Sequence, residues 1–195
     1  LPIKNNLFTN NRRLLKNLLT SNAIAIFNSN DIMPTNSDGV MPFIQNSDLF
    51  WLSGVNQEES VLVLFPNHPN KEMREILFLK ETNAIIAIWE GAKLTKKDAY
   101  NTSGIKTTYW LSELVPKLNE LILMADTIYL NKNIHSRATS QTQTRDDRFR
   151  LMIEEKYPNK KIKEIAPIMH NLRSIKSNIE VELMQTACNI TEKGL

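Results

Sequence analysis

Two short runs without a polar residue place the tightest constraint on the fold of this chain. They are AIAIF at residues 23–27 and VLVLF at residues 61–65, followed by the turn-forming residues 28–31 and 66–70. A strand that is apolar on both sides of its pleat has to be covered on both faces of its sheet. We therefore expect a β-sheet with helices on its faces.

The rest of the chain alternates short apolar runs with segments of helical periodicity. Leucines at one-turn spacing predict an opening helix around residues 14–19. Capping-box patterns at residues 95–98 and 177–180 predict two more helices, the second of which runs to the end of the chain. Residues 131–144 are polar and unpatterned, which is typical of a loop. Together these features predict an α/β fold with a mixed sheet flanked by helices. The further predicted strands are 50–52, 60–65, 75–79, 127–130 and 162–165, and the further helices are 111–124 and 145–157.

Composition suits one compact domain and argues against several classes of partner. The chain has 195 residues, of which 42% are hydrophobic, and 24 Lys and Arg balance 21 Asp and Glu. This mixed surface does not favour nucleic acid. The longest apolar runs are far below the roughly 20 residues that a membrane span needs. Together with a single cysteine, Cys188, these features predict a cytoplasmic protein without membrane contact.

No residue pattern in the chain indicates a catalytic site. The three histidines have neither HxxxH nor HExxH spacing, and the five glycines form no phosphate-binding loop. The adjacent acids Asp146-Asp147 and Glu154-Glu155 point in different directions on a helix, so we interpret them as a solvated face. The residues alone therefore indicate a non-catalytic α/β domain that binds no metal.

Four segments resemble one known family. The stretch QNSDLFWLSG at residues 45–54, with the strand after it, resembles the signature of the N-terminal domain of Xaa-Pro aminopeptidases (aminopeptidase P). IWEGAKL at 88–94, LRSIKS at 172–177 with Glu180, and Arg12-Arg13 resemble further family segments in the same order. The match spans nearly the whole chain. It departs from the family at Ile44, where Arg is usual, and at Gln57-Glu58, where Glu-Pro is common.

The resemblance implies a fold, a domain division and a parent enzyme. Residues 1–176 would form a domain of the creatinase/prolidase N-terminal, ribonuclease-H-like type. Residues 177–195 would be the linker and first helix of a C-terminal metallopeptidase domain. That domain would hold two Mn²⁺ ions and remove the residue preceding proline from proline-containing peptides. The fragment itself would bind no cofactor and would be inactive. Its partners would be the C-terminal catalytic domain of the same chain and further copies of the enzyme, in a homodimer or homotetramer.

The resemblance also implies roles for a few residues. Trp89 becomes a candidate for the wall of the active-site entrance, against the alternative that it packs beside Ile85, Ile86 and Ile88. From the chemistry of their own side chains, Asn46, Ser47 and Asp48 are expected to bond local backbone groups where a buried strand begins, and Gly54 to permit the bend after it. The alternative is that this stretch lines the active-site entrance.

Two other functions compete with an accessory domain of a peptidase. One is a stand-alone binding or interaction module without peptidase activity. The other, a ribonuclease-H-like nuclease, is disfavoured because the predicted strands carry almost no carboxylates.

Overall fold

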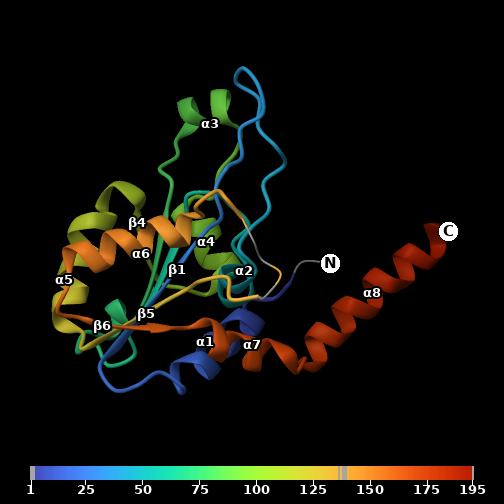
Figure 1. The fold of residues 1–195 in the computed structure, drawn as a ribbon. Coiled ribbons are helices and arrows are strands. Elements are labelled where there is room, and N and C mark those ends of the chain that lie inside the picture. The colour runs from blue at the N-terminus through green and yellow to red at the C-terminus, as the bar shows by residue number, and fades with distance from the viewer. Residues whose placement is uncertain (1–2, 136, 138–139, 195) are drawn as a thin grey trace.

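A mixed six-stranded sheet organises the molecule (Figure 1). The computed structural model describes residues 3–135, 137 and 140–194. The strand order is β4-β3-β2-β1-β5-β6; β1 pairs with β2 and β2 with β3 in antiparallel fashion, and the other pairs are parallel. The strands are β1 (Ala23–Asn28), β2 (Val61–Leu64), β3 (Glu75–Leu79), β4 (Thr107–Trp110), β5 (Thr127–Leu130) and β6 (Lys161–Glu164).

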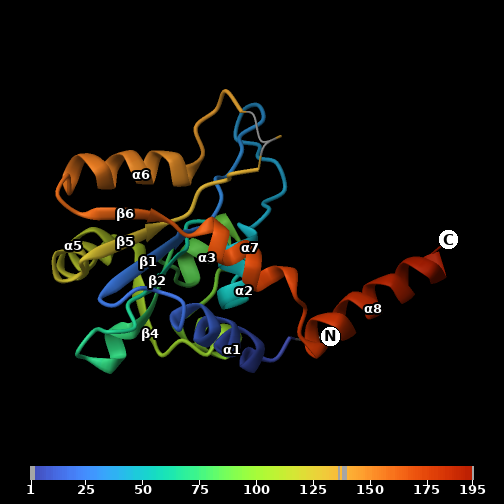
Figure 2. The same ribbon diagram turned by 60° about the horizontal axis from the view of Figure 1, so that its bottom comes forward.

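Helices cover both faces of the sheet, with α6 and α1 on opposite sides (Figure 2). One face packs against α1, α2, α4 and α7, and the other against α5 and α6. The helices are α1 (Asn5–Lys16), α2 (Ser47–Ser53), α3 (Ala84–Glu90), α4 (Lys96–Ser103), α5 (Leu114–Met124), α6 (Arg145–Lys156), α7 (Ala166–Ser174) and α8 (Asn178–Gly194), with short 3-10 turns η1 (Lys71–Arg74) and η2 (Leu111–Glu113).

The central strand β1 shows why two-sided burial was the decisive sequence feature. Ala25 and Phe27 point into the core on one face, and Ile24 and Ile26 into the core on the other. All six residues of β1 are buried. The prediction of an α/β fold with helices on both faces is confirmed.

The predicted strand at residues 50–52 is wrong, because these residues lie inside α2. The side chain of Asn46 accepts hydrogen bonds from the backbone N–H groups of Asp48 and Leu49, which starts a helix at this point. Leu49 and Leu52, three residues apart, then share the buried face of this helix. A helical cap thus overrides the strand preference of the aromatic residues.

The remaining predicted elements differ from the structure mainly at their ends. The opening helix begins at Asn5 rather than near the leucines, and it ends at Lys16. The helix predicted for 111–124 opens with η2 before α5 begins. The edge strand β4 was not predicted. The predicted loop contains residues 136, 138 and 139, which lie outside the described residues.

Helix α8 leaves the body of the molecule and extends away from it (Figures 1 and 2). None of its residues is buried. Its predicted capping box is confirmed, since the Glu180 carboxylate accepts from the backbone N–H and the hydroxyl of Ser177, both at 2.7 Å. Within the described part of the chain, no helix combines the length and hydropathy needed to cross a membrane.

Candidate functional site

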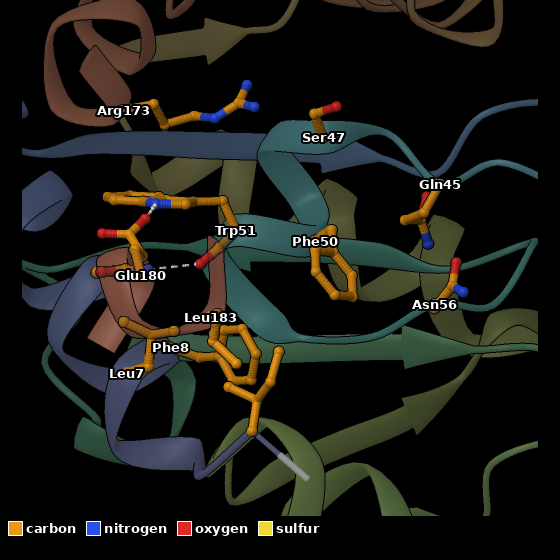
Figure 3. Close-up of a pocket in the computed structure, with 12 residues that line it drawn as sticks. Leu7, Phe8, Gln45, Ser47, Phe50, Trp51, Asn56, Arg173, Glu180 and Leu183 are labelled. Atoms are coloured by element: carbon orange, nitrogen blue, oxygen red, sulfur yellow. Dashed lines mark hydrogen bonds between the residues drawn. The ribbon is translucent and has the colours of Figure 1, made fainter. Parts of the chain in front are cut away.

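Two of the family-like motifs, residues 45–54 and 172–180, meet in space where α2, α7 and the start of α8 come together. Arg173 Nη1 donates a hydrogen bond to Asp48 Oδ1 at 2.7 Å. Trp51 Nε1 donates to Glu180 Oε1, also at 2.7 Å (Figure 3). We call these four residues the motif junction. It links side chains that lie 125 and 129 positions apart in the chain.

Asp48 holds three separate segments together. Besides Arg173, its carboxylate accepts a hydrogen bond from Asn131 Nδ2 at 3.0 Å, immediately after β5. The sequence predicts bonds from Asp48 to local backbone groups, but Asn46 makes those bonds and Asp48 bonds distant side chains instead. Ser47, the first residue of α2, is exposed.

Gly54 ends α2 in the left-handed conformation, with φ of 70°. Its backbone N–H donates to Phe50 O at 2.7 Å. A Cβ at this position would lie 2.3 Å from the Phe8 ring, so Phe8 packs where a side chain would otherwise be. Gly54 therefore serves both the turn and the contact between α1 and α2.

Glu180 is held in its ionised form by the groups around it. Burial alone would raise the pKa of this carboxyl, but hydrogen bonds from Ser177 and Trp51 outweigh it and the pKa lies below its usual value. A charged Glu180 near the first turn of α8 also complements the dipole of that helix. The start of α8 is thus fixed by several charge-assisted contacts.

Two cavities adjoin the motif junction, and Gln45, Ser47 and Arg173 line both of them. The first, the aromatic cavity, has a volume of about 410 Å³ and lies between α1, α2 and α8 (Figure 3). The second, the polar crevice, has a volume of about 370 Å³. Apolar side chains of the aromatic cavity include Leu7, Phe8, Phe50, Trp51 and Leu183. Charged and titratable side chains of the polar crevice are Asp48, Lys132, Asp146, His170 and Arg173.

Asp146 is the most perturbed carboxyl group in the polar crevice. Burial raises the pKa of Asp146 to about 6, although Asn28 Nδ2 donates a hydrogen bond to its Oδ1 at 2.9 Å. The nearby charges of Asp147 and Asp48 raise the pKa further. The interpretation of Asp146-Asp147 as a solvated pair is therefore wrong for Asp146, while Asp147 caps α6 through Thr144.

Trp89 lies apart from the motif junction, near the end of α3. Its side chain is 85% exposed, and it lines neither the aromatic cavity nor the polar crevice. Its neighbours Ile85 and Ile88 are also exposed, at 72% and 76%. Helix α3 is held by its Asn83 cap and by an ion pair between Lys80 and Glu90.

The described residues do not supply a metal centre. Across residues 3–135, 137 and 140–194, no group of three or more His, Cys, Asp or Glu side chains is placed to hold an ion. The ligand set that the family resemblance implies for two Mn²⁺ ions therefore has no counterpart in the part of the chain that the structure describes.

Several residues of the site escaped the sequence analysis as individuals. Arg173 and Glu180 were noticed only as parts of a family-like motif, and Trp51 only as part of another such motif and of a predicted strand. Their partners are more than 120 residues away in the chain, so no local pattern could pair them. Asn28 and Asn131 carried one weak signal, because each stands at or just after the end of a buried strand.

Comparisons with known proteins agree on one family. The family model described as the aminopeptidase P N-terminal domain matches residues 8–129. The Xaa-Pro aminopeptidase of Haemophilus influenzae is 25% identical over 159 residues, covering 82% of this chain and 34% of the relative. The Escherichia coli Xaa-Pro aminopeptidase is 24% identical over 180 residues, covering 91% and 40%. This chain thus spans well under half the length of these curated relatives.

Solved structures of low sequence identity share the fold. A Bacillus anthracis protein described as an aminopeptidase P aligns with a TM-score of 0.88 and 22% identity, covering 98% of this chain and 45% of that one. Escherichia coli aminopeptidase P, in its low-pH form, aligns with a TM-score of 0.74 and 22% identity, covering 92% and 41%.

Proposed function

We propose, from the premise that this chain belongs to the family of aminopeptidase P N-terminal domains, that it is the non-catalytic N-terminal part of an Xaa-Pro aminopeptidase. Such an enzyme is a hydrolase that removes the amino-terminal residue preceding proline. The observation that carries the proposal is the family match over residues 8–129. The motif junction supports it, because it joins the family-like segments at the point where α8 leaves the domain.

The residues of this chain indicate which domain would carry out hydrolysis. No group of the described residues is placed to hold a metal ion, so we assign hydrolysis to a second domain that would carry two Mn²⁺ ions. In this proposal the described residues of this chain perform no chemical step. The role of this chain is positional. Helix α8 presents Ile179, Val181, Met184 and Ile190 to solvent, and we propose that it continues into the catalytic domain, which covers them.

The role that we propose for α3 is contact with a second copy of the enzyme near its active-site entrance. Three large apolar side chains, Ile85, Ile88 and Trp89, are more than 70% exposed on this seven-residue helix. Exposed apolar side chains grouped in this way mark contact surfaces more often than free surface. The proposed assembly is a homodimer or homotetramer, and the proposed location is the cytoplasm, which the single thiol of Cys188 suits.

The proposed function is tested by reading the gene beyond codon 195 and assaying what it encodes. We expect an open frame that supplies two Asp, one His and two Glu residues in that order. The full protein should release the first residue of Xaa-Pro peptides when Mn²⁺ is present, and residues 1–195 alone should not. A stop codon after Leu195, or a full protein inactive on such peptides, would contradict the proposal.

A second function is a stand-alone binding module without peptidase activity. The polar crevice favours it, because Asp146 in its lining is bonded to Asn28, whose buried Oδ1 has no hydrogen-bond partner among the described residues. A frame that stops after Leu195 would select this function over the first.

A further inference from the structure

The polar crevice lies where open α/β sheets most often bind ligands. Strands β1, β5 and β6 are parallel, so their carboxyl ends meet at one edge of the sheet. In the sheet, β2, β3 and β4 lie on one side of β1, and β5 and β6 lie on its other side. The boundary between β1 and β5 is therefore a topological switch point, and ligands bind in the crevice beside such a point.

The side of the crevice next to α6 carries the carboxylate of Asp146. The charge of the neighbouring Arg145 acts on this carboxylate, but the Arg145 guanidinium donates its hydrogen bond to Ser29 Oγ at 2.7 Å instead. Asp146 receives a hydrogen bond from the neutral amide of Asn28, and among the described residues it forms no ion pair. Asn28 is 2% exposed, and its Oδ1 has no hydrogen-bond partner within the described part of the chain. Buried polar atoms are nearly always satisfied, so two neighbouring groups that can still accept hydrogen bonds point to a missing cationic donor.

The other side of the crevice carries positive charge that is only partly used. Arg173 pairs with Asp48 through a single nitrogen, Nη1, and its side chain is 36% exposed. Lys132 and His170 line the same crevice and take part in no ion pair among the residues described. Guanidinium, ammonium and imidazole groups together suit a carboxylate.

We propose that the polar crevice binds a small zwitterion of the α-amino-acid type. The ligand's ammonium group would donate to the carboxylate of Asp146, and its carboxylate would be held by Lys132, His170 and Arg173. The volume of about 370 Å³ falls within the range of small-molecule sites, which is about 300–1,000 Å³. A free amino acid and a dipeptide share this chemistry. The inference stands without the proposed peptidase function, which it would complement by placing a product-like ligand on this domain.

Calorimetric titration of residues 1–195 tests the inference with four probes: L-leucine, L-leucyl-L-proline, N-acetyl-L-leucine and L-leucinamide. We expect saturable binding of leucine or of the dipeptide, and whichever binds identifies the source. N-acetyl-L-leucine lacks the ammonium group and L-leucinamide lacks the carboxylate. Each should bind about tenfold or more weakly than leucine, because each loses one charge-assisted contact. No saturable binding of leucine or dipeptide up to roughly 10 mM, which corresponds to a negligible affinity, would overturn the proposal.

Variants locate the binding site within the crevice. Asp146→Asn should weaken binding of the better probe about tenfold, and Lys132→Met should weaken it about threefold to tenfold. Glu155→Gln, on the exposed face of the same helix, is the matched control and should bind as wild type. Because a variant could lose its fold, amide NMR shifts of the unaltered protein provide a second measurement. Shifts that cluster away from residues 28, 131, 146 and 173, or an Asp146→Asn variant that binds normally, would overturn the assignment.

Discussion

At the scale of single residues, Arg12 is the largest fully buried side chain among the described residues. Its Nη1 donates to Leu52 O at 2.8 Å and to Ser103 O at 3.0 Å, and its Nε donates to Glu75 at 2.9 Å. Burial would raise the pKa of Glu75, but Arg12 and Lys16 outweigh it and the pKa lies below its usual value. One arginine on α1 therefore satisfies groups on α2, α4 and β3.

Replacing Arg12 with Met should cost about 3–5 kcal/mol of the free energy of unfolding, because two carbonyls and a carboxylate lose their buried partner. Urea unfolding at pH 7 measures this loss. Arg13→Met is the matched control, since the exposed Arg13 side chain bonds, within the described part of the chain, only the Asn10 side chain. It should change stability by less than about 0.5 kcal/mol. Equal losses for the two variants would contradict the role given to Arg12.

Asp146 should make the wild-type protein less stable as the pH rises. Its pKa is raised to about 6 in the folded state, so folding favours the protonated form. The stability associated with this proton is complete below the ordinary pKa of 3.8 and is lost as the pH rises through about 6. Asp146→Asn should therefore be about 1–3 kcal/mol more stable than wild type at pH 7.5 and nearly equal to it below pH 4.

Urea unfolding of both proteins at pH 3.5 and pH 7.5 measures this difference. A gain in stability that accompanies lost ligand binding is the expected signature of a binding residue rather than of a structural one. A variant that is less stable than wild type at pH 7.5 would show that the carboxylate stabilises the fold.

At the scale of an element, the end of α2 depends on Gly54 for two separable reasons. Gly54 and Gly104 each end a helix in the left-handed conformation, with φ of 70° and 73°. A Cβ would lie 2.3 Å from the Phe8 ring at Gly54, but 2.8 Å from the small Thr9 hydroxyl at Gly104. Gly104→Ala should cost about 1–2 kcal/mol, chiefly from backbone strain, because the Thr9 hydroxyl can turn away by rotation of its side chain. Gly54→Ala should cost a further 1–3 kcal/mol or so from the clash with Phe8.

Thermal unfolding of the two glycine variants separates these terms. The larger loss at Gly54 measures the packing of α1 against α2, because the backbone strain is nearly the same at both positions. Similar melting temperatures for the two variants would mean that Phe8 moves aside without cost.

At the scale of the whole molecule, the direction of α8 relative to the domain depends on few contacts. No residue of α8 is buried, and Trp51 donates the one side-chain hydrogen bond that the described residues show between α2 and this helix. Trp51→Phe keeps an aromatic ring but removes the donor. We expect faster hydrogen exchange over residues 178–186, by roughly tenfold if the bond to the charged Glu180 contributes about 1.5 kcal/mol.

Trp89→Phe is the matched control for this experiment, because Trp89 lies on α3 and lines neither cavity of the motif junction. It should leave exchange in α8 unchanged. Unchanged exchange in Trp51→Phe as well would mean that the Ser177 capping box alone sets the stability of the start of α8.

Helices and strands could be predicted from the sequence where a single local signal, such as an apolar run or a capping box, was sufficient. The apolar runs of β1 and β2 fixed two-sided burial, and the capping boxes at Thr95 and Ser177 marked helices that the structure contains. The prediction failed at α2, where the side chain of Asn46 competes with a run of residues that favour strands. Two local preferences conflicted there, and the packing of Leu49 and Leu52 against the sheet favours the helix.

The sequence by itself determined the α/β class, the order of most elements and the family-like motifs, because each depends on neighbours in the chain. Only the tertiary structure decided which residues form a site. The pairing of Asp48 with Arg173, the burial of Arg12 and the isolation of Asp146 arise from contacts across 60 to 125 residues. Periodicity does not encode such contacts. They exist because the mixed sheet brings the ends of β1, β5 and β6 to one edge, where distant side chains must satisfy one another or a ligand.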